Sequence, residues 1–270
     1  MTLRPIRLVV TDVDGTLVRP DRTLAPATLA AVARLRAAGV KLALVSSRPP
    51  RGLDMLSGPL GLDTPRAGFN GAVIEDAAGN VVEQHTIATD ATGAAVALLE
   101  AAGVDVWLFA GNAWLLTNPD GACVAEEHAA VGMKWRRVAT FSPHLAGVHK
   151  VMASSADHDR IGALETVLHQ RIGAEATVHR SQPWYLDITH RDANKGAAAL
   201  ALARLLGVDA AAMACLGDMA NDVPMFAVAG LAIAMGNAPA SVQARAHAVT
   251  AGNDADGWAA AIDRFVLPRP

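Results

Sequence analysis

The sequence predicts an α/β protein whose doubly wound, mostly parallel sheet is interrupted by an inserted α+β domain. Apolar strand-like runs alternate with helical segments toward both ends of the chain, whereas hairpin signals fill the middle. A length of 270 residues is also near the size at which a single core stops growing. We therefore expect residues 1–80 and 188–270 to form the doubly wound domain and residues 81–187 to form the insertion.

The first three elements form a βαβ unit. An apolar, β-branched run over Ile6–Val10 stops at Thr11 and Asp12, which is typical of a strand buried on both faces of a parallel sheet. Residues 26–38 have helical spacing, with a proline at the start and a glycine just past the end. A second strand is expected over residues 41–45, so the crossover should be right-handed.

From about Asn80 the sequence pattern changes from alternating strands and helices to hairpin signals. Gly111 and Asn112 form a turn dipeptide between two strand-like runs, which predicts an antiparallel hairpin. Helices are expected over 90–102 and 159–172, and strands over 148–154, 176–182 and 184–190.

The alternation of strands and helices returns after Asn194. The pattern predicts a helix that ends at Gly207, a strand over 213–216, a helix over 223–228 and a strand over 231–235. The two ends of the chain should therefore build one sheet.

The composition favours a protein that binds small molecules over one that binds nucleic acids or membranes. The chain is 52% hydrophobic with a net charge of -3 and a pI near 6.3, so it has no global attraction to nucleic acid or to anionic membranes. Cys123 and Cys215 lack the paired spacing of a zinc or redox motif, and we expect free thiols in a reducing cytosol. With no signal peptide or membrane span expected, the prediction is a cytoplasmic protein of unspecified oligomeric state.

Two carboxylates stand where the first strand opens into a glycine loop. Asp12 and Asp14 precede Gly15, and ligands bind at such strand ends in open α/β sheets. A carboxylate can attack phosphorus as a covalent nucleophile if a cation removes the charge repulsion. Asp12 is placed for this, and Asp14 could protonate the leaving oxygen and then activate water. The alternative is an ordinary acidic turn.

Two single residues at later strand and helix ends are compatible with phosphate binding. Ser46 follows the second strand, where its hydroxyl could meet a phosphoryl oxygen, although serine is also a common turn residue. Lys195 opens a helix, where its cation could reach both the nucleophile and the phosphate. A lone lysine is otherwise a solvated surface residue.

A third acidic segment follows the strand MACL. Asp218, Asn221 and Asp222 bring oxygen ligands to another strand end, and Mg²⁺ prefers such ligands. Asn221 or Asp222 could at the same time cap the next helix.

DVDGTL, Ser46, Lys195 and GDMANDVPM together resemble the four ordered motifs of the haloacid dehalogenase (HAD) superfamily. The Cof-type phosphatases are the most similar, because they also carry a large α/β cap between the second and third motifs, together with signatures like Asn70-Gly71 and Gly236-Asn237-Ala238. The resemblance spans the whole chain and implies a HAD Rossmann-like core with an inserted cap. One departure is Ser47, where relatives commonly have glycine, which could alter the turn.

The resemblance also implies the roles of the site residues. Asp12 would be the nucleophile and a magnesium ligand, and Asp14 the acid/base that binds the metal through its backbone carbonyl. Asp218 would be the second carboxylate ligand, with Asp222 supporting the metal site. The phosphoryl group would be held by Ser46, Lys195 and Asn221.

The implied activity is Mg²⁺-dependent hydrolysis of a small phosphomonoester, a sugar phosphate or a phosphorylated cofactor, through an aspartyl phosphate. A phosphomutase, a glycosyl-phosphoester phosphatase and a non-catalytic sensor of phosphorylated metabolites are the alternatives. A sensor would gain nothing from an acid beside a nucleophile. Dehalogenation is disfavoured because it requires neither Asp14 nor a magnesium cluster.

Other residue types give weaker signals. The histidines form no HExxH pair, and Glu126-Glu127-His128 lacks the spacing of a zinc helix. Aromatic residues in the insertion can line a substrate pocket or form core, and Asp187 and His190 can face the cleft or a strand edge. The aromatic residues are Trp107, Trp114, Trp184 and Tyr185.

Overall fold

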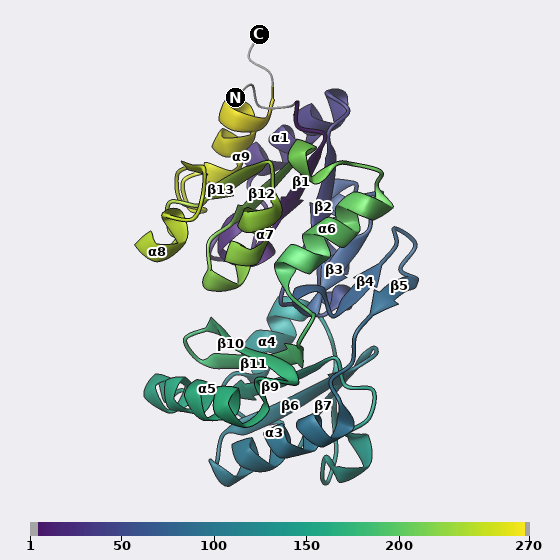
Figure 1. The fold of residues 1–270 in the computed structure, drawn as a ribbon, viewed down its shortest axis with the longest axis vertical. Coiled ribbons are helices and arrows are strands. Elements are labelled where there is room, and N and C mark those ends of the chain that lie inside the picture. The colour runs from purple at the N-terminus through teal and green to yellow at the C-terminus, as the bar shows by residue number, and fades with distance from the viewer. Residues whose placement is uncertain (1–4, 268–270) are drawn as a thin grey trace.

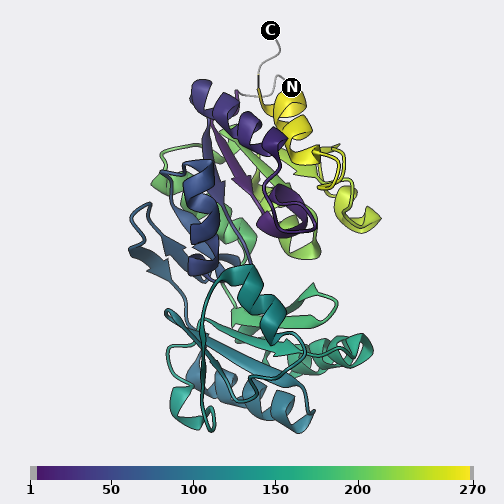
Figure 2. The same cartoon turned by 180° about the vertical axis from the view of Figure 1, so that it is seen from behind.

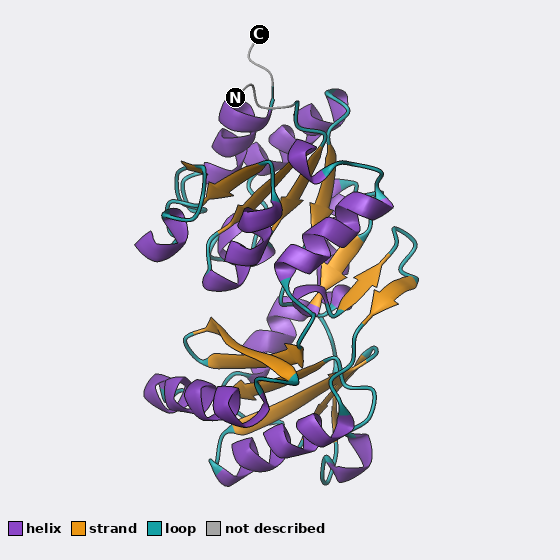
Figure 3. Cartoon of the chain, in the orientation of Figure 1, coloured by secondary structure: helices purple, strands orange, loops and turns teal. Residues whose placement is uncertain are grey.

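The computed structural model describes residues 5–267 and contains two main sheets, one near the two termini and one at the opposite end of the molecule (Figures 1 and 3). The fold is α/β, with a parallel core sheet and an inserted α+β part, as the sequence predicts. Among the described residues, no helix is long and apolar enough to cross a membrane.

The core sheet has the order β14-β13-β12-β1-β2, and every neighbouring pair is parallel. The chain leaves β1 on one side for β2 and later returns on the other side at β12. Ligands bind at the carboxyl ends of strands at such a switch point. The strands are β1 (Leu8–Thr11), β2 (Lys41–Leu44), β12 (Met213–Gly217), β13 (Leu231–Ala234) and β14 (Ala248–Val249).

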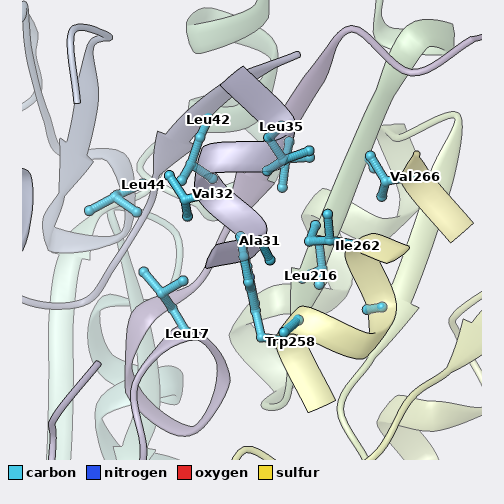
Figure 4. Packing of buried hydrophobic residues seen from close by; sticks show 14 of the residues in the cluster. Leu17, Ala31, Val32, Leu35, Leu42, Leu44, Leu216, Trp258, Ile262 and Val266 are labelled. Carbon is cyan, nitrogen blue, oxygen red and sulfur yellow. The ribbon is translucent and has the colours of Figure 1, made fainter. Parts of the chain in front are cut away.

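Helices cover both faces of the core sheet, which explains why β1 is buried throughout and apolar over its first three residues. Val9 packs with α1 and α9 on one face, while Leu8 and Val10 pack with α6 and α7 on the other. Figure 4 shows the first of these clusters, and Figure 2 shows the helices that cover it. The core helices are α1 (Pro26–Ala37), α2 (Asp54–Leu60), α6 (Lys195–Leu205), α7 (Val223–Val228), α8 (Ala240–Gln243) and α9 (Gly257–Ala261).

The second sheet has the order β10-β11-β9-β6-β7-β8 and is antiparallel except for the parallel pair of β7 and β8. One face packs on α3 and α5 through aliphatic side chains, and the other carries an aromatic cluster beside α4. Its elements are α3 (Thr89–Ala101), β6 (Asp105–Ala110), β7 (Ala113–Leu116), α4 (Val124–Val131), β8 (Trp135–Arg137), β9 (Lys150–Ser154), α5 (His158–Ile172), β10 (Ala176–Gln182) and β11 (Tyr185–His190).

A small antiparallel sheet lies at the predicted junction near residue 80. It consists of β3 (Arg66–Gly68), β4 (Val73–Glu75) and β5 (Val81–Gln84). Antiparallel pairing therefore starts before Asn80, and a parallel bridge from Val45 to Ala67 joins β3 to the core. At the other junction β11 continues past residue 187 to His190 within the six-stranded sheet. We propose connections between the two parts near residues 85 and 191.

Candidate active site

The acidic residues of the two most informative motifs meet at the carboxyl end of the core sheet. Asp12 follows β1 and Asp218 follows β12, and these strands pair with Thr11 opposite Leu216. The register places both aspartates at the same edge, where the Asp12 N–H donates to the Leu216 carbonyl at 2.9 Å.

Lys195 lies at the centre of this acidic group. At the first turn of α6, its Nζ is 2.5 Å from Asp12 Oδ1 and 2.7 Å from Asp222 Oδ1, and all three side chains are buried. Asn194 caps the helix by accepting from the Ala197 N–H, which fixes where the lysine emerges. The ammonium therefore neutralises part of the local charge.

Three carboxylates outnumber this single buried cation. Oxygens of Asp12, Asp218 and Asp222 lie within 4.8 Å of one another. Burial raises the pKa of Asp12 well above its usual range, although Lys195 opposes this. Burial and then Asp222 raise the pKa of Asp218 to about 7. Such a surplus of buried negative charge is relieved by a bound cation, and these oxygens can hold a metal ion.

Neighbouring groups fix two of the carboxylates in place. Asp222 Oδ2 accepts from the backbone N–H groups of Asp218 and Met219, each at 2.9 Å. Asp218 accepts from the Thr16 hydroxyl at 2.9 Å. Gly15 has φ +80, and any Cβ there would collide with Asp218, so the turn needs glycine for both reasons.

The other two predicted phosphate ligands lie on adjoining loops. Ser46 is buried just after β2, and its hydroxyl accepts from the Arg48 N–H at 3.1 Å. Asn221 Nδ2 donates to Asn70 Oδ1 at 3.1 Å, and Asn70 also contacts His179 Nε2 of the inserted part at 3.0 Å. Asn70 holds a positive φ of 57°, a left-handed conformation that asparagine adopts more readily than most residues.

Two cavities flank this group between the core and the inserted part. One, of about 370 Å³, is lined by Asp14 and Asp218 together with Glu127 and Lys150 of the inserted part. The other, of about 470 Å³, is lined by Lys195, Asn70 and Asn221 among others. Asp218 thus borders the first cavity and Lys195 the second, whereas Asp12 and Asp222 line neither.

Comparison with known proteins identifies the family. A sequence profile of haloacid dehalogenase-like hydrolases matches residues 9–262. The chain belongs to this family. A HMP-PP phosphatase of Cronobacter sakazakii is 30% identical over 86% of this chain and 85% of its own length. This HAD-type hydrolase is accordingly a phosphatase, and the Cof-type resemblance is confirmed.

Two further relatives extend the match over nearly the whole chain. Pyridoxal phosphate phosphatase YbhA of Escherichia coli is 26% identical over 94% of this chain and 96% of its own length. The solved structure of a HAD subclass IIB sugar phosphatase superposes with a TM-score of 0.86, at 23% identity, over 97% of this chain and all of the other. The fold of this hydrolase is therefore a HAD core with an inserted cap, and we call the inserted part the cap from here on.

Sequence reasoning overlooked Arg48, which holds the Asp14 carboxylate. The guanidinium donates from Nε to Oδ2 at 2.7 Å and from Nη2 to Oδ1 at 2.6 Å. It is buried, whereas the Asp14 side chain is 31% exposed. The pKa of Arg48 is raised because the bond and charge of Asp14 outweigh burial, which acts in the opposite direction. The only sequence signal was the position of Arg48 two residues after Ser46.

The aromatic residues of the cap divide between core and cavity. Trp107 and Trp114 are fully buried in the cap core, whereas Trp184 and Tyr185 line the 370 Å³ cavity. His190 stacks on His85 away from both cavities.

The remaining cap candidate and the two cysteines are all buried. Asp187 pairs with Lys150 at 2.7 Å and does not face the cleft as a free carboxylate. Cys123 and Cys215 are free thiols.

Proposed function

We propose that this HAD-type phosphatase is Mg²⁺-dependent and hydrolyses a small phosphomonoester through an aspartyl phosphate on Asp12. The observation that carries the proposal is the buried Lys195 between Asp12 and Asp222, with Asp218 alongside, at the carboxyl ends of β1 and β12. A nucleophilic carboxylate needs adjacent positive charge so that a phosphate dianion can approach. Lys195 supplies one such charge.

The residues would act in two steps. An Asp12 oxygen attacks phosphorus and the bond to the leaving oxygen breaks, while Asp14 donates a proton to that oxygen. Asp14 then accepts a proton from a water that attacks the phosphorus of the aspartyl phosphate, which releases phosphate and restores Asp12. Hydrogen bonds from Ser46, Lys195 and Asn221 would stabilise the phosphoryl oxygens.

The donor set fits a magnesium ion. Three buried carboxylates and one lysine leave an excess of negative charge, and carboxylate oxygens are the ligands that Mg²⁺ prefers. Asp12, Asp218 and the backbone carbonyl of Asp14 would hold the ion, with Asp222 in support. When bound, the ion would reduce the repulsion between Asp12 and the phosphate.

The substrate would be a sugar phosphate or a phosphorylated cofactor. The relatives named above are a HMP-PP phosphatase, a pyridoxal phosphate phosphatase and a sugar phosphatase. The cap elements that line the 370 Å³ cavity opposite Asp14 support recognition of the leaving group there. We propose that the cap opens for substrate and closes to exclude water.

The first test is release of phosphate from p-nitrophenyl phosphate with and without Mg²⁺. Turnover should require the ion, and beryllium fluoride with Mg²⁺ should inhibit by imitating the aspartyl phosphate. In Asp218→Ala the Mg²⁺ concentration for half-maximal rate should rise at least about tenfold, because a charged ligand is lost. Asp209→Ala, which is remote from the cluster, is the matched control. Metal-independent turnover would refute the proposal.

A further inference from the structure

The charges that line the 370 Å³ cavity are almost completely matched within the protein. Each of the four cations among its described lining residues is paired with a carboxylate at 2.6–3.0 Å. The pairs are Arg19 with Asp256, Arg22 with Glu126, Arg48 with Asp14 and Lys150 with Asp187. The cavity therefore offers no free cation for a second anionic group of a ligand.

Two carboxylates in the lining remain without such a partner. Asp218 belongs to the proposed metal site. Glu127 on α4 is 8% exposed, and no cationic nitrogen of residues 5–267 lies within 4.0 Å of its carboxylate. Tyr185 is a polar neighbour of Glu127, and the pKa of its hydroxyl is raised by burial and then by the charge of Glu127.

An unmatched buried carboxylate is costly to the protein. Burial raises the pKa of Glu127, and the charge of Lys150 offsets only part of this effect. A ligand that presents a cationic or hydrogen-bond-donating group to Glu127 would remove that penalty, whereas an anionic ligand would increase it.

Contacts with the core hold α4, and therefore Glu127, over the proposed catalytic residues. Arg48 Nη1, from the guanidinium that binds Asp14, donates to the Ala130 carbonyl at 2.9 Å. Arg22 binds both the carbonyl and the carboxylate of Glu126 at 3.1 and 3.0 Å. A leaving group held beside Asp14 would thus meet Glu127 at a fixed position.

We infer that Glu127 selects the leaving group by charge, so that phosphomonoesters with an amine or hydroxyl donor are preferred over those with a second anionic group. This inference rests on the proposed function, because it assumes that the leaving group occupies the cavity beside Asp14. It assigns substrate selection to one side chain of α4.

The test uses alkyl monophosphates of equal chain length that end in an amine, a hydroxyl or a carboxylate, compared over a short range of lengths. In the wild-type enzyme kcat/KM should fall in that order, and the amine should exceed the carboxylate by roughly 10²-fold for the chain length that reaches Glu127. Glu127→Gln should reduce this ratio to within about threefold of one, since the amide has no charge. Glu100→Gln, an exposed change on α3, should leave the ratio as it is in the wild type.

The outcomes separate the two proposals. If no ester, including p-nitrophenyl phosphate, is turned over with Mg²⁺, the proposed function fails. If esters are hydrolysed without the charge order, or if Glu127→Gln keeps the wild-type ratio, the inference is overturned while the function stands. The wild-type order alone tests the inference if Glu127→Gln does not fold.

Discussion

The core and the cap of this hydrolase each bury a lysine among carboxylates, but the charges balance differently. In the core, Lys195 lies 2.5 Å from Asp12 and 2.7 Å from Asp222, and Asp218 completes a group with more negative than positive charge. In the cap, Lys150 pairs with Asp187 alone at 2.7 Å. The first arrangement is suited to binding a cation, and the second is a neutral pair at the wall of the 370 Å³ cavity.

This difference predicts two kinds of mutational effect. Core substitutions should reduce turnover for every phosphate ester, because the reacting phosphorus is common to all substrates. Cap substitutions should change stability or the preference among esters, because the cap contacts only the part that differs. The following predictions test this contrast in order of decreasing effect.

The largest effect is expected for Asp12→Asn. An amide is a poor nucleophile, so kcat/KM should fall by roughly 10⁴-fold or more on every ester tested. Steady-state kinetics on p-nitrophenyl phosphate and on an alkyl phosphate check this, with circular dichroism as the control for folding. Activity within tenfold of the wild type would end the covalent mechanism.

The next largest effect is expected for Asp14→Ala, and it should depend on the leaving group. Loss of a general acid costs roughly 10²–10⁴-fold on an alkyl phosphate. The loss should be smaller for p-nitrophenyl phosphate, whose acidic leaving group departs with little help from a proton. The same two esters measure this, and equal losses on both would show that Asp14 is not the acid.

In the cap, Asp187→Asn should act on stability. It leaves the Lys150 ammonium buried without its partner carboxylate at 2.7 Å, and such a loss typically costs about 3–5 kcal/mol in the free energy of unfolding. Urea unfolding measures this change. The double change Lys150→Met with Asp187→Leu should recover most of the loss, and Asp192→Asn, from an exposed pair, is the control. If Asp187→Asn lowers the free energy of unfolding no more than the control does, the buried pair contributes no more to stability than an exposed pair.

The smallest effect is a pH dependence of stability in the metal-free protein. The folded-state pKa of Asp218, about 7, lies above its ordinary value of 3.8, so the folded state holds the proton more tightly than the unfolded chain. The free energy of unfolding should therefore fall as pH rises between these values and then level off.

Asp218→Asn lacks this titration, so the difference between wild type and variant isolates it from the histidines. With a chelator present, the wild type should lose on the order of 2 kcal/mol relative to Asp218→Asn between about pH 4 and pH 8. Urea unfolding across that range measures both proteins. Parallel pH profiles would show that burial does not perturb Asp218.

The sequence predicted the core site better than the cap because of how each is built. Asp12 and Asp218 directly follow a strand, and Ser46 lies two residues after the end of one. Parallel strands bring their carboxyl ends together, so these positions meet at one edge of the sheet. The direction of the Arg48 guanidinium depends on its contacts with Asp14 and the Ala130 carbonyl, which no local pattern encodes.

The cap cavity is assembled from distant segments. Glu127 belongs to a helix that the pattern did not reveal, and Lys150 and Tyr185 come from two strands whose inward-facing residues depend on register. Strand-like runs predicted β9, β10 and β11 to within two residues. The short strands β3 to β5 were missed because three or four residues are too few to establish a period.

The central claim is that the phosphoryl group is transferred to Asp12, and trapping the aspartyl phosphate tests this claim most directly. An acyl phosphate on an aspartate is reduced by borohydride to homoserine, so the enzyme should be quenched during turnover with Mg²⁺, reduced and digested with trypsin. Fragment-ion mass spectrometry of the peptide Leu8–Arg22 should then show homoserine at position 12, only when substrate and metal are present. Homoserine at position 14, or none at either position while turnover proceeds under conditions that trap a control aspartyl phosphate, would contradict the account.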